Sequence, residues 1–376
     1  MNAFQPRTDR REPSASVIVR DLHDRLAALG ERYDAVPTFP RDSLSLLVRS
    51  GLHLRYAPVA AGGTGFSDAR EENLDLLDAL RGVGRADLSL GRLFEGHVNA
   101  LKLFDWYADP EAFRKLASEL SRGALYGVWA TEPPPGVRIV GQGDTPVLDG
   151  AKAFATGAGG LAFAIITARA ETGPRCLVIV RANDAGRTDL SNWRVRGMRA
   201  TGSGRYDVSG LPAGLGQQLG QPGDYDREPR FTAGAWRFTA VQLGGIEALL
   251  TETRAALSDA AKADPLQRAQ FAQAVVATRT AGLWVREAAL RAADEGIDAA
   301  DFVRMTRGVV ERAGLDVMEL AARLVGTRSA FDGQRIDKIT RDLSLYLRQA
   351  GPDHARDQAA IAWLDHDVWG GEDVLW

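Results

Sequence analysis

Leu125-Tyr-Gly-Val-Trp-Ala-Thr-Glu-Pro133 begins the part of the chain that decides the fold. Leu148-Asp-Gly-Ala-Lys-Ala-Phe-Ala-Thr-Gly157 and Arg196-Gly-Met-Arg-Ala-Thr-Gly-Ser-Gly204 follow it. Short apolar runs separated by turn residues, such as Asp149-Gly150, are typical of closely spaced strands. Residues 125–222 are therefore predicted to form a middle domain, an antiparallel β-barrel.

The regions on both sides of this domain are predicted to be helical. In residues 1–124, apolar residues recur at spacings of three and four, which indicates an N-terminal helical domain. In residues 228–376, four long amphipathic segments with short connections predict an up-down four-helix bundle. These segments are Trp236–Leu257, Gln267–Ala293, Phe302–Val325 and Ile336–Leu347. The predicted fold class is thus an α+β protein of three domains.

Composition excludes several classes of function. The 376 residues carry 46 Lys and Arg against 49 Asp and Glu, a net charge of −3, which gives no electrostatic case for nucleic acid or an anionic membrane. The single cysteine, Cys176, excludes a disulfide framework, and the five histidines are scattered without the spacing of metal ligands. The polar stretch Met1–Ser16 does not have the apolar core of a secretory signal. We therefore expect a cytoplasmic protein without a metal site.

Several motifs together resemble those of the acyl-CoA dehydrogenase superfamily. Pro58-Val-Ala-Ala-Gly-Gly-Thr-Gly65 is similar to a glycine-rich turn of its N-terminal domain. Thr131-Glu-Pro133 and Gly150-x-Lys152-x-Phe154-x-Thr156 are similar to its two flavin-contacting segments, and Arg341-Asp342 lies in the matching position of the last bundle helix. The resemblance implies a helical domain, a β-barrel and a four-helix bundle, assembled as a homodimer or homotetramer.

The resemblance also implies a flavin, FAD or alternatively FMN, between the barrel and the bundle. Its isoalloxazine ring is expected to lie against Trp129, Ala130, Thr131, Phe154 and Thr156. Arg268 and Gly326 are expected to contact the pyrophosphate or adenine part. Without the resemblance, the same residues would be read as plain strands with threonines on a solvent-facing side.

The chain departs from this family where substrate and catalytic base are expected. Pro133-Pro-Pro-Gly136 replaces a hydroxyl-bearing loop that contacts the acyl-CoA, which puts binding of a CoA thioester in doubt. The two positions at which the family carries its catalytic glutamate fall on Ala350 and Gly234. A relocated base is the alternative, with Asp353 as its main candidate and Glu228 as the other.

Three functions remain open from the sequence. The first is an FAD-dependent oxidoreductase similar to acyl-CoA dehydrogenases, acting on an acyl thioester or related small organic substrate. The second is a two-component flavin monooxygenase, because Ser89-Leu-Gly-Arg-Leu-Phe-Glu-Gly-His97 resembles a segment whose histidine lines the pocket in that branch. There His97 would be catalytic, Thr156 would be a hydroxyl donor, and the branch's second histidine falls on Gln349. Such enzymes work with a flavin reductase or an electron-transfer partner.

The third possibility is a catalytically inactive scaffold or partner subunit with the same fold. His97 itself has a second interpretation, as a helix residue that bonds to a neighbouring loop.

Overall fold

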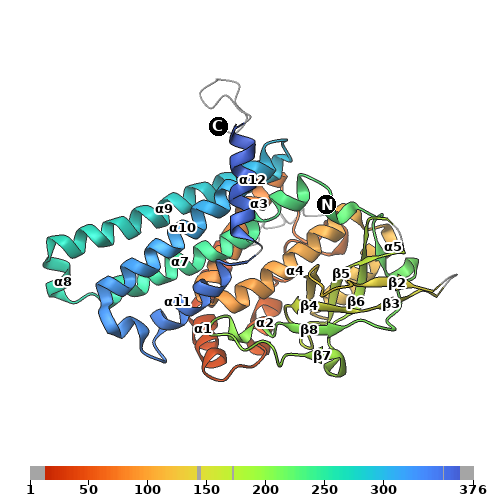
Figure 1. Ribbon diagram of the computed structural model, residues 1–376, viewed down its shortest axis with the longest axis horizontal. Helices are drawn as coiled ribbons and strands as arrows, with labels where there is room; N and C mark the ends of the chain where they lie inside the picture. Colours follow the sequence, from red (N-terminus) through yellow and green to blue (C-terminus); the bar gives the residue numbers. More distant parts are fainter. Residues whose placement is uncertain (1–12, 142–144, 172, 350, 365–376) are drawn as a thin grey trace, which may run out of the picture.

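The computed structural model describes residues 13–141, 145–171, 173–349 and 351–364. Long helices occupy one end and the middle of the molecule, and the strands occupy the other end (Figure 1). Helix α4 runs between the two parts and connects them (Figure 1). The position of α4 makes its side chains the natural place for a site shared by strands and helices.

Five helices form the N-terminal part. They are α1 (Ala15–Ala35), α2 (Arg41–Arg49), α3 (Ala69–Ala86), α4 (Leu88–Tyr107) and α5 (Pro110–Ser121). Asp68 begins α3 by accepting a hydrogen bond from the backbone N–H of Glu71, and Asp87 begins α4 by accepting one from Leu90. Most of the α4 residues from Leu88 to Phe104 are buried, so this helix is surrounded by other elements.

The described residues of the middle part form nine strands in two sheets. The strands are β1 (Tyr126–Trp129), β2 (Arg138–Val140), β3 (Val147–Asp149), β4 (Ala151–Ala155), β5 (Phe163–Arg169), β6 (Arg175–Arg181), β7 (Thr188–Asp189), β8 (Gly204–Asp207) and β9 (Gln218–Leu219). The larger sheet has the order β3-β2-β5-β6-β9, with β1 paired to β5, and the smaller has the order β4-β8-β7.

This arrangement corrects the predicted antiparallel barrel. The residues that the structure describes form no closed barrel, and both β1 and β2 pair with β5 in parallel. The two sheets separate at Gly150, where φ is +126° and an added Cβ would lie 2.8 Å from the carbonyl oxygen of Gly136. The chain therefore changes sheet between β3 and β4 at a residue that has to be glycine.

The C-terminal part contains the four predicted long helices and further ones. They are α6 (Arg230–Ala233), α7 (Trp236–Ala256), α8 (Asp259–Ala263), α9 (Pro265–Asp294), α10 (Ala299–Val325), α11 (Arg335–Tyr346) and α12 (Pro352–Leu364). Helices α3 and α7 approach closely at two glycines: an added Cβ would lie 2.5 Å from Val241 O at Gly84 and 2.1 Å from Arg81 O at Gly244. Side chains at either position would push the N-terminal helices away from the bundle.

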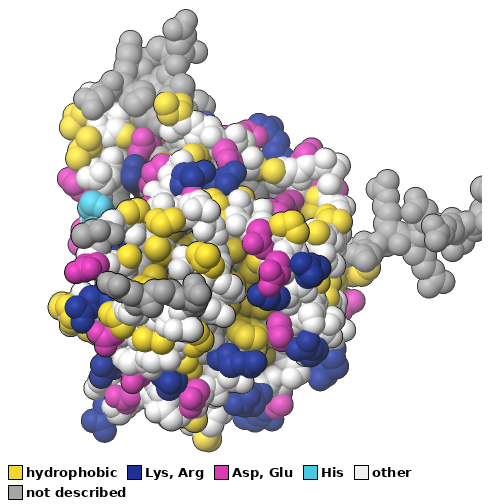
Figure 2. Space-filling view, turned by 90° about the vertical axis from the view of Figure 1, so that its right-hand side faces the viewer, with side chains coloured by type: hydrophobic (Ala, Val, Ile, Leu, Met, Phe, Trp, Pro, Cys, Tyr) yellow, Lys and Arg dark blue, Asp and Glu magenta, His cyan; other side chains and the backbone are white. Residues whose placement is uncertain are grey.

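The surface of the strand-bearing end is mixed in character. Figure 2 shows hydrophobic side chains near the middle of this face and charged side chains of both signs around them. The face therefore has no extended patch of a single charge sign. Within the described part of the chain, no helix combines the length and apolarity that crossing a membrane would require.

Candidate functional site

The two predicted flavin-contacting segments lie side by side. The N–H of Ala153 donates to the carbonyl oxygen of Thr131 at 2.9 Å, and the indole Nε1 of Trp129 donates to the carbonyl oxygen of Thr156 at 2.9 Å. The Trp129 side chain is buried against Tyr206, so it holds the two segments together from inside. Thr131 is exposed and the hydroxyl of Thr156 is partly so, whereas Trp129 cannot present its ring to a ligand.

Phe154 has an unusual conformation for a strand residue. Its φ is +50°, its pairing with β8 is irregular, and its side chain is 67% exposed. A non-glycine residue held in the left-handed region costs on the order of 1 kcal/mol or more, and such strain concentrates at binding sites. The exposed ring next to Thr156 is suited to pack against a flat ligand.

A chain of hydroxyl groups leads to Thr156. The Thr201 hydroxyl donates to the carbonyl oxygen of Met198 at 2.9 Å and lies 2.9 Å from the Ser203 hydroxyl. Ser203 donates to the Thr156 oxygen at 3.2 Å. Each hydroxyl has one proton, so Ser203 cannot donate to Thr201 and to Thr156 at the same time. When Ser203 donates to Thr156, the Thr156 oxygen accepts and the Thr156 proton is available to another group. The site thus offers an oriented donor.

Glu132 and Lys152, which belong to the same two motifs, form an ion pair with each other. The Lys152 Nζ is completely buried and also donates to the Thr167 hydroxyl at 3.0 Å. Burial lowers the pKa of Lys152, and Glu132 opposes that shift. These two residues therefore connect the larger sheet to β4, and neither is free for a ligand.

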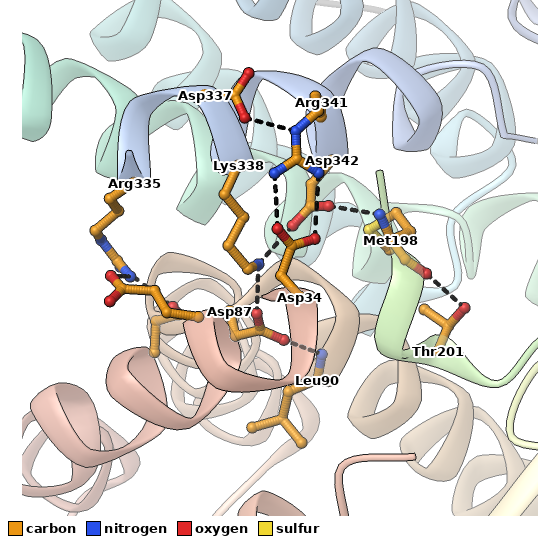
Figure 3. Close-up of polar contacts among 12 residues, drawn as sticks. Asp34, Asp87, Leu90, Met198, Thr201, Arg335, Asp337, Lys338, Arg341 and Asp342 are labelled. Carbon is orange, nitrogen blue, oxygen red and sulfur yellow. Dashed lines mark hydrogen bonds and ion pairs between the residues drawn. The ribbon is translucent and has the colours of Figure 1, made fainter. Parts of the chain in front are cut away.

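A buried ionic cluster holds the hydroxyl chain in place (Figure 3). Lys338 Nζ lies 2.6 Å from Asp87 Oδ2 and 2.7 Å from Asp342 Oδ2, and the second oxygen of Asp342 accepts from the backbone N–H of Met198. Burial alone would lower the pKa of Lys338, but the two carboxylates raise it above its usual value. We call Asp87, Lys338 and Asp342 the cap cluster, because Asp87 also caps α4.

The loop before the hydroxyl chain packs directly on α11. An added Cβ at Gly197 would lie 2.0 Å from the carbonyl oxygen of Arg341, so only glycine fits there. Arg341 donates to the carbonyl oxygen of Arg196 at 2.6 Å and pairs with Asp34 of α1 at 2.7 Å. The Arg341-Asp342 motif therefore joins α1, α11 and the loop that leads to Thr156.

In this structure His97 is a helix residue that bonds to neighbouring backbone, which is the second of the two interpretations that the sequence allowed. Its ring is buried, Nε2 lies 2.6 Å from the carbonyl oxygen of His53, and Nδ1 accepts from the backbone N–H of Tyr126 at 3.1 Å. Burial lowers the pKa of His97 to about 4. Both ring nitrogens are used by backbone groups, so a neutral His97 connects α4 to β1. This geometry gives it no contact for a catalytic role.

A second buried polar group lies along the middle of α4 and was not predicted. Arg92 and Asn99 each donate to a different oxygen of Glu95, and Arg237 Nε of α7 donates to Asn99 Oδ1 at 2.5 Å. We call these four residues the mid-helix cluster. The available sequence signal was the spacing of positions 92, 95 and 99 in a largely apolar helix, which places these three residues on one face.

Helix α4 packs against the segment that carries Thr156. An added Cβ at Gly157, the residue after Thr156, would lie 3.0 Å from Leu93 Cδ2 of α4. Tyr346 of α11 is buried with no partner for its hydroxyl among the described residues, and its pKa is raised well above the usual value by burial and by the charge of Glu95. Glu95 of the mid-helix cluster therefore lies near α11 of the bundle.

The predicted replacements for the catalytic base do not lie in a dry pocket. The Asp353 side chain is 92% exposed in the first turn of α12 and pairs with Arg356. Glu228 accepts from the backbone N–H of Thr232 at 3.1 Å and is exposed. Ala350 lies outside the described residues. A general base for carbon acids needs a water-excluded position, so the geometry of Asp353 and Glu228 argues against both.

Arg268 and Gly326 lie in the bundle and away from the strands. Arg268 is exposed and donates to the carbonyl oxygens of Lys262 and Ala263 at the end of α8, which is at the far end of the bundle in Figure 1. Gly326 ends α10 with φ +71° and has open space around it. Within one chain neither is brought together with Thr156. Their flavin contact remains a prediction that needs a neighbouring subunit.

No protein-family model matches the chain, and no curated protein matches it by sequence. Solved structures do match it. TdsC, the dibenzothiophene monooxygenase of Paenibacillus sp. A11-2, was solved in complex with FMN and indole. It is 20% identical, and the match covers 94% of this chain and 97% of TdsC at a TM-score of 0.84. Methanesulfinate monooxygenase MsuC of Pseudomonas fluorescens matches with the same identity and coverage at a TM-score of 0.82.

Glutaryl-coenzyme A dehydrogenase in complex with glutaryl-CoA also matches. It is 16% identical, and the match covers 96% of this chain and 97% of that chain at a TM-score of 0.82. At these identities the similarity establishes the fold. The chain has the fold of the acyl-CoA dehydrogenase superfamily over nearly its whole length, which confirms the resemblance found in its motifs at the level of the fold.

Proposed function

We propose that this protein is a flavin-dependent oxidoreductase for a small organic substrate, and that it uses reduced flavin and oxygen as a two-component monooxygenase. The flavin would lie against Thr131, Phe154 and Thr156. FMN is the first candidate, since TdsC binds it, and FAD is the second. A bound reduced flavin supplies the two electrons needed for the activation of oxygen.

The hydroxyl of Thr156 is the observation that carries this proposal. Its oxygen accepts from the Ser203 hydroxyl, which leaves its own proton available for a ligand. It lies beside the exposed ring of Phe154, which is held in a strained conformation. An isoalloxazine needs an apolar surface and donors at fixed positions along its edge, and these residues fit that need.

The residue at one of the family's catalytic-base positions, Gly234, favours a monooxygenase over a dehydrogenase. Removing an α-proton from an acyl thioester requires a carboxylate in a dry site. Gly234 carries no side chain, and an added Cβ there would lie 2.6 Å from Nη2 of Arg237. A guanidinium holds an anion but does not accept a proton. The arrangement therefore supports chemistry that needs no carbon-acid base.

The test is a titration of the purified protein with FMN and FAD, each in the oxidised and the reduced state. We expect reduced FMN to bind and oxygen to be consumed when a reductase supplies reduced flavin. Thr156→Val should weaken flavin binding about tenfold, roughly 1.4 kcal/mol, because one hydrogen bond to the ring is lost. Thr188→Val is the matched control, since Thr188 lies on β7 and its hydroxyl donates to the carbonyl oxygen of Asp184.

Two outcomes would contradict the proposal. Reduction of bound FAD by an acyl-CoA, without added reduced flavin, would identify a dehydrogenase. Failure to bind either flavin in either redox state would identify the inactive scaffold that the sequence also allowed.

A further inference from the structure

A small polar cavity lies beside the mid-helix cluster, among α3, α4, α6, α7 and α9. Its volume is about 110 Å³. Its lining includes Lys102, Trp106, Arg230, Gly234, Trp236 and Arg237. This combination of cations and aromatic rings inside a protein needs an electrostatic explanation, because buried charges are costly unless they are paired.

All but one of these cations are paired with a carboxylate. Lys102 lies 2.5 Å from Glu72 and 3.9 Å from Asp105, and Arg230 lies 2.8 Å from Glu295. Arg92, deeper in the cluster, pairs with Glu95. Every carboxylate near the cavity therefore already contacts a cation.

Arg237 is the exception. Its partners among the described residues are a neutral amide oxygen, Asn99 Oδ1, and the face of the Trp106 ring at 6.0 Å. Arg237 is only 8% exposed, and burial lowers its pKa to about 10 although Glu95 and Glu72 oppose the shift. A guanidinium has five N–H donors in a planar fork. Most of the donors of Arg237 thus remain for a ligand.

The second observation is an unused donor in the same lining. Trp236 is completely buried, and its indole Nε1–H has no hydrogen-bond partner. An unpaired buried N–H typically costs about 1–3 kcal/mol. Trp236 forms part of the cavity wall, so its indole N–H resonance can report what the cavity holds.

The third observation is the position of Gly234. The absence of a side chain there leaves the space that Nη2 of Arg237 occupies, at 2.6 Å from where a Cβ would stand. The position at which related enzymes can carry an acidic side chain is thus filled by a cation.

We propose that this cavity binds the carboxylate of a small organic acid, held by the guanidinium of Arg237, with the Trp236 indole as part of the wall. The described lining residues belong to helices and their flanking residues and include none of the candidate flavin-contacting residues, so this site does not depend on the proposed function. Paired N–H···O bonds from a guanidinium match the planar geometry of a carboxylate.

The test compares butanoate with butanamide, which has nearly the same shape and no charge, at constant NaCl concentration. Binding is followed through the indole N–H resonance of Trp236 in an NMR spectrum, assigned with Trp236→Phe. Butanoate is expected to shift this resonance and to bind at least tenfold more tightly than butanamide. Arg237→Met should weaken butanoate binding at least tenfold, and Arg237→Lys should weaken it by a smaller factor.

Arg323→Met is the matched control, because Arg323 is an exposed arginine of α10 paired with Glu319. It should bind butanoate as the wild type does. Equal affinity of wild type for butanoate and butanamide would overturn the proposal, and so would unchanged butanoate binding in a folded Arg237→Met or Arg237→Lys variant.

Flavin binding separates this proposal from the proposed function. Arg237→Met should keep the flavin affinity of the wild type, since Thr156 and its hydroxyl chain are untouched. If the wild type binds butanoate through Arg237 but binds no flavin, the proposed function fails and the carboxylate site stands. If flavin binds and butanoate does not, the carboxylate site fails alone.

Discussion

Helix α4 carries two buried ionic clusters that differ in how completely their charges are matched. The cap cluster has two carboxylates and one ammonium, and its remaining oxygens accept from the backbone N–H groups of Leu90 and Met198. The mid-helix cluster has two guanidiniums and one carboxylate, and Arg237 faces a cavity with only Asn99 as a hydrogen-bond partner. One cluster is complete without a ligand and the other is not.

The physical reason lies in the elements around each cluster. A helix start and a loop supply backbone N–H groups, which satisfy the excess of negative charge in the cap cluster. The middle of a helix has no free backbone groups, so an excess of positive charge there stays unmatched. A buried cluster whose charges are all paired within the protein stabilises the fold. A buried cluster with an unpaired charge is available to bind a ligand of opposite charge.

The largest expected effect is that of Lys338→Met in the cap cluster. The change leaves Asp87 and Asp342 buried without their cation, which should lower the free energy of unfolding by about 3–5 kcal/mol. Urea unfolding at pH 7.5 measures it. Lys115→Met is the control, because Lys115 forms an exposed i,i+4 pair with Glu111 and should cost less than about 1 kcal/mol. Equal losses in the two variants would contradict the comparison.

His97 is a further buried titratable group on α4, and its hydrogen-bond partners are backbone atoms. Its pKa falls from 6.5 to about 4 on folding, so the unfolded chain binds a proton where the folded chain does not. The full contribution to stability is present above pH 6.5, declines between pH 6.5 and 4, and is constant below. The shift corresponds to roughly 3 kcal/mol.

Unfolding experiments between pH 7.5 and 4 measure this decline in the wild type and in His97→Gln. The decline should be clearly shallower in His97→Gln, with a remainder from His53 and His23, whose pKa values are also lowered by burial. Exposed His354→Gln should leave the decline unchanged. A wild-type pH dependence in His97→Gln would show that folding does not lower the pKa of His97.

Arg237→Met tests the mid-helix cluster by stability. The change removes the free-energy cost of burying a cation that has no carboxylate partner. It also removes one hydrogen bond, to Asn99. The two effects are of similar size, so the free energy of unfolding should change by less than about 1 kcal/mol in either direction. Urea unfolding beside Lys338→Met gives the difference. A loss as large as that of Lys338→Met would mean that the mid-helix cluster is as complete as the cap cluster.

Asp353→Asn should have the smallest effect. The carboxylate is 92% exposed in a surface pair with Arg356, so both stability and flavin binding should stay within about 0.5 kcal/mol of the wild type. Oxygen consumption with reduced flavin measures the activity. A loss of activity of more than tenfold would restore Asp353 as a candidate base.

The sequence by itself determined the order of helical, strand-rich and helical regions, because apolar periodicity and turn residues are local signals. It also placed Thr131 and Phe154–Thr156 in one region, through motifs that lie close together in the chain. The open sheets were not predictable in this way, since pairing of β1 and β2 with β5 depends on residues far apart in sequence.

Only the tertiary structure decided what the charged residues do. Lys338 meets Asp87 across 251 positions of the chain, and Arg237 meets Asn99 across 138. Whether His97, Asp353 or Arg237 is buried, and what each contacts, follows from how helices and loops pack together. Charge pairing in a protein interior is a property of that packing, so sequence spacing could name these residues but could not assign their roles.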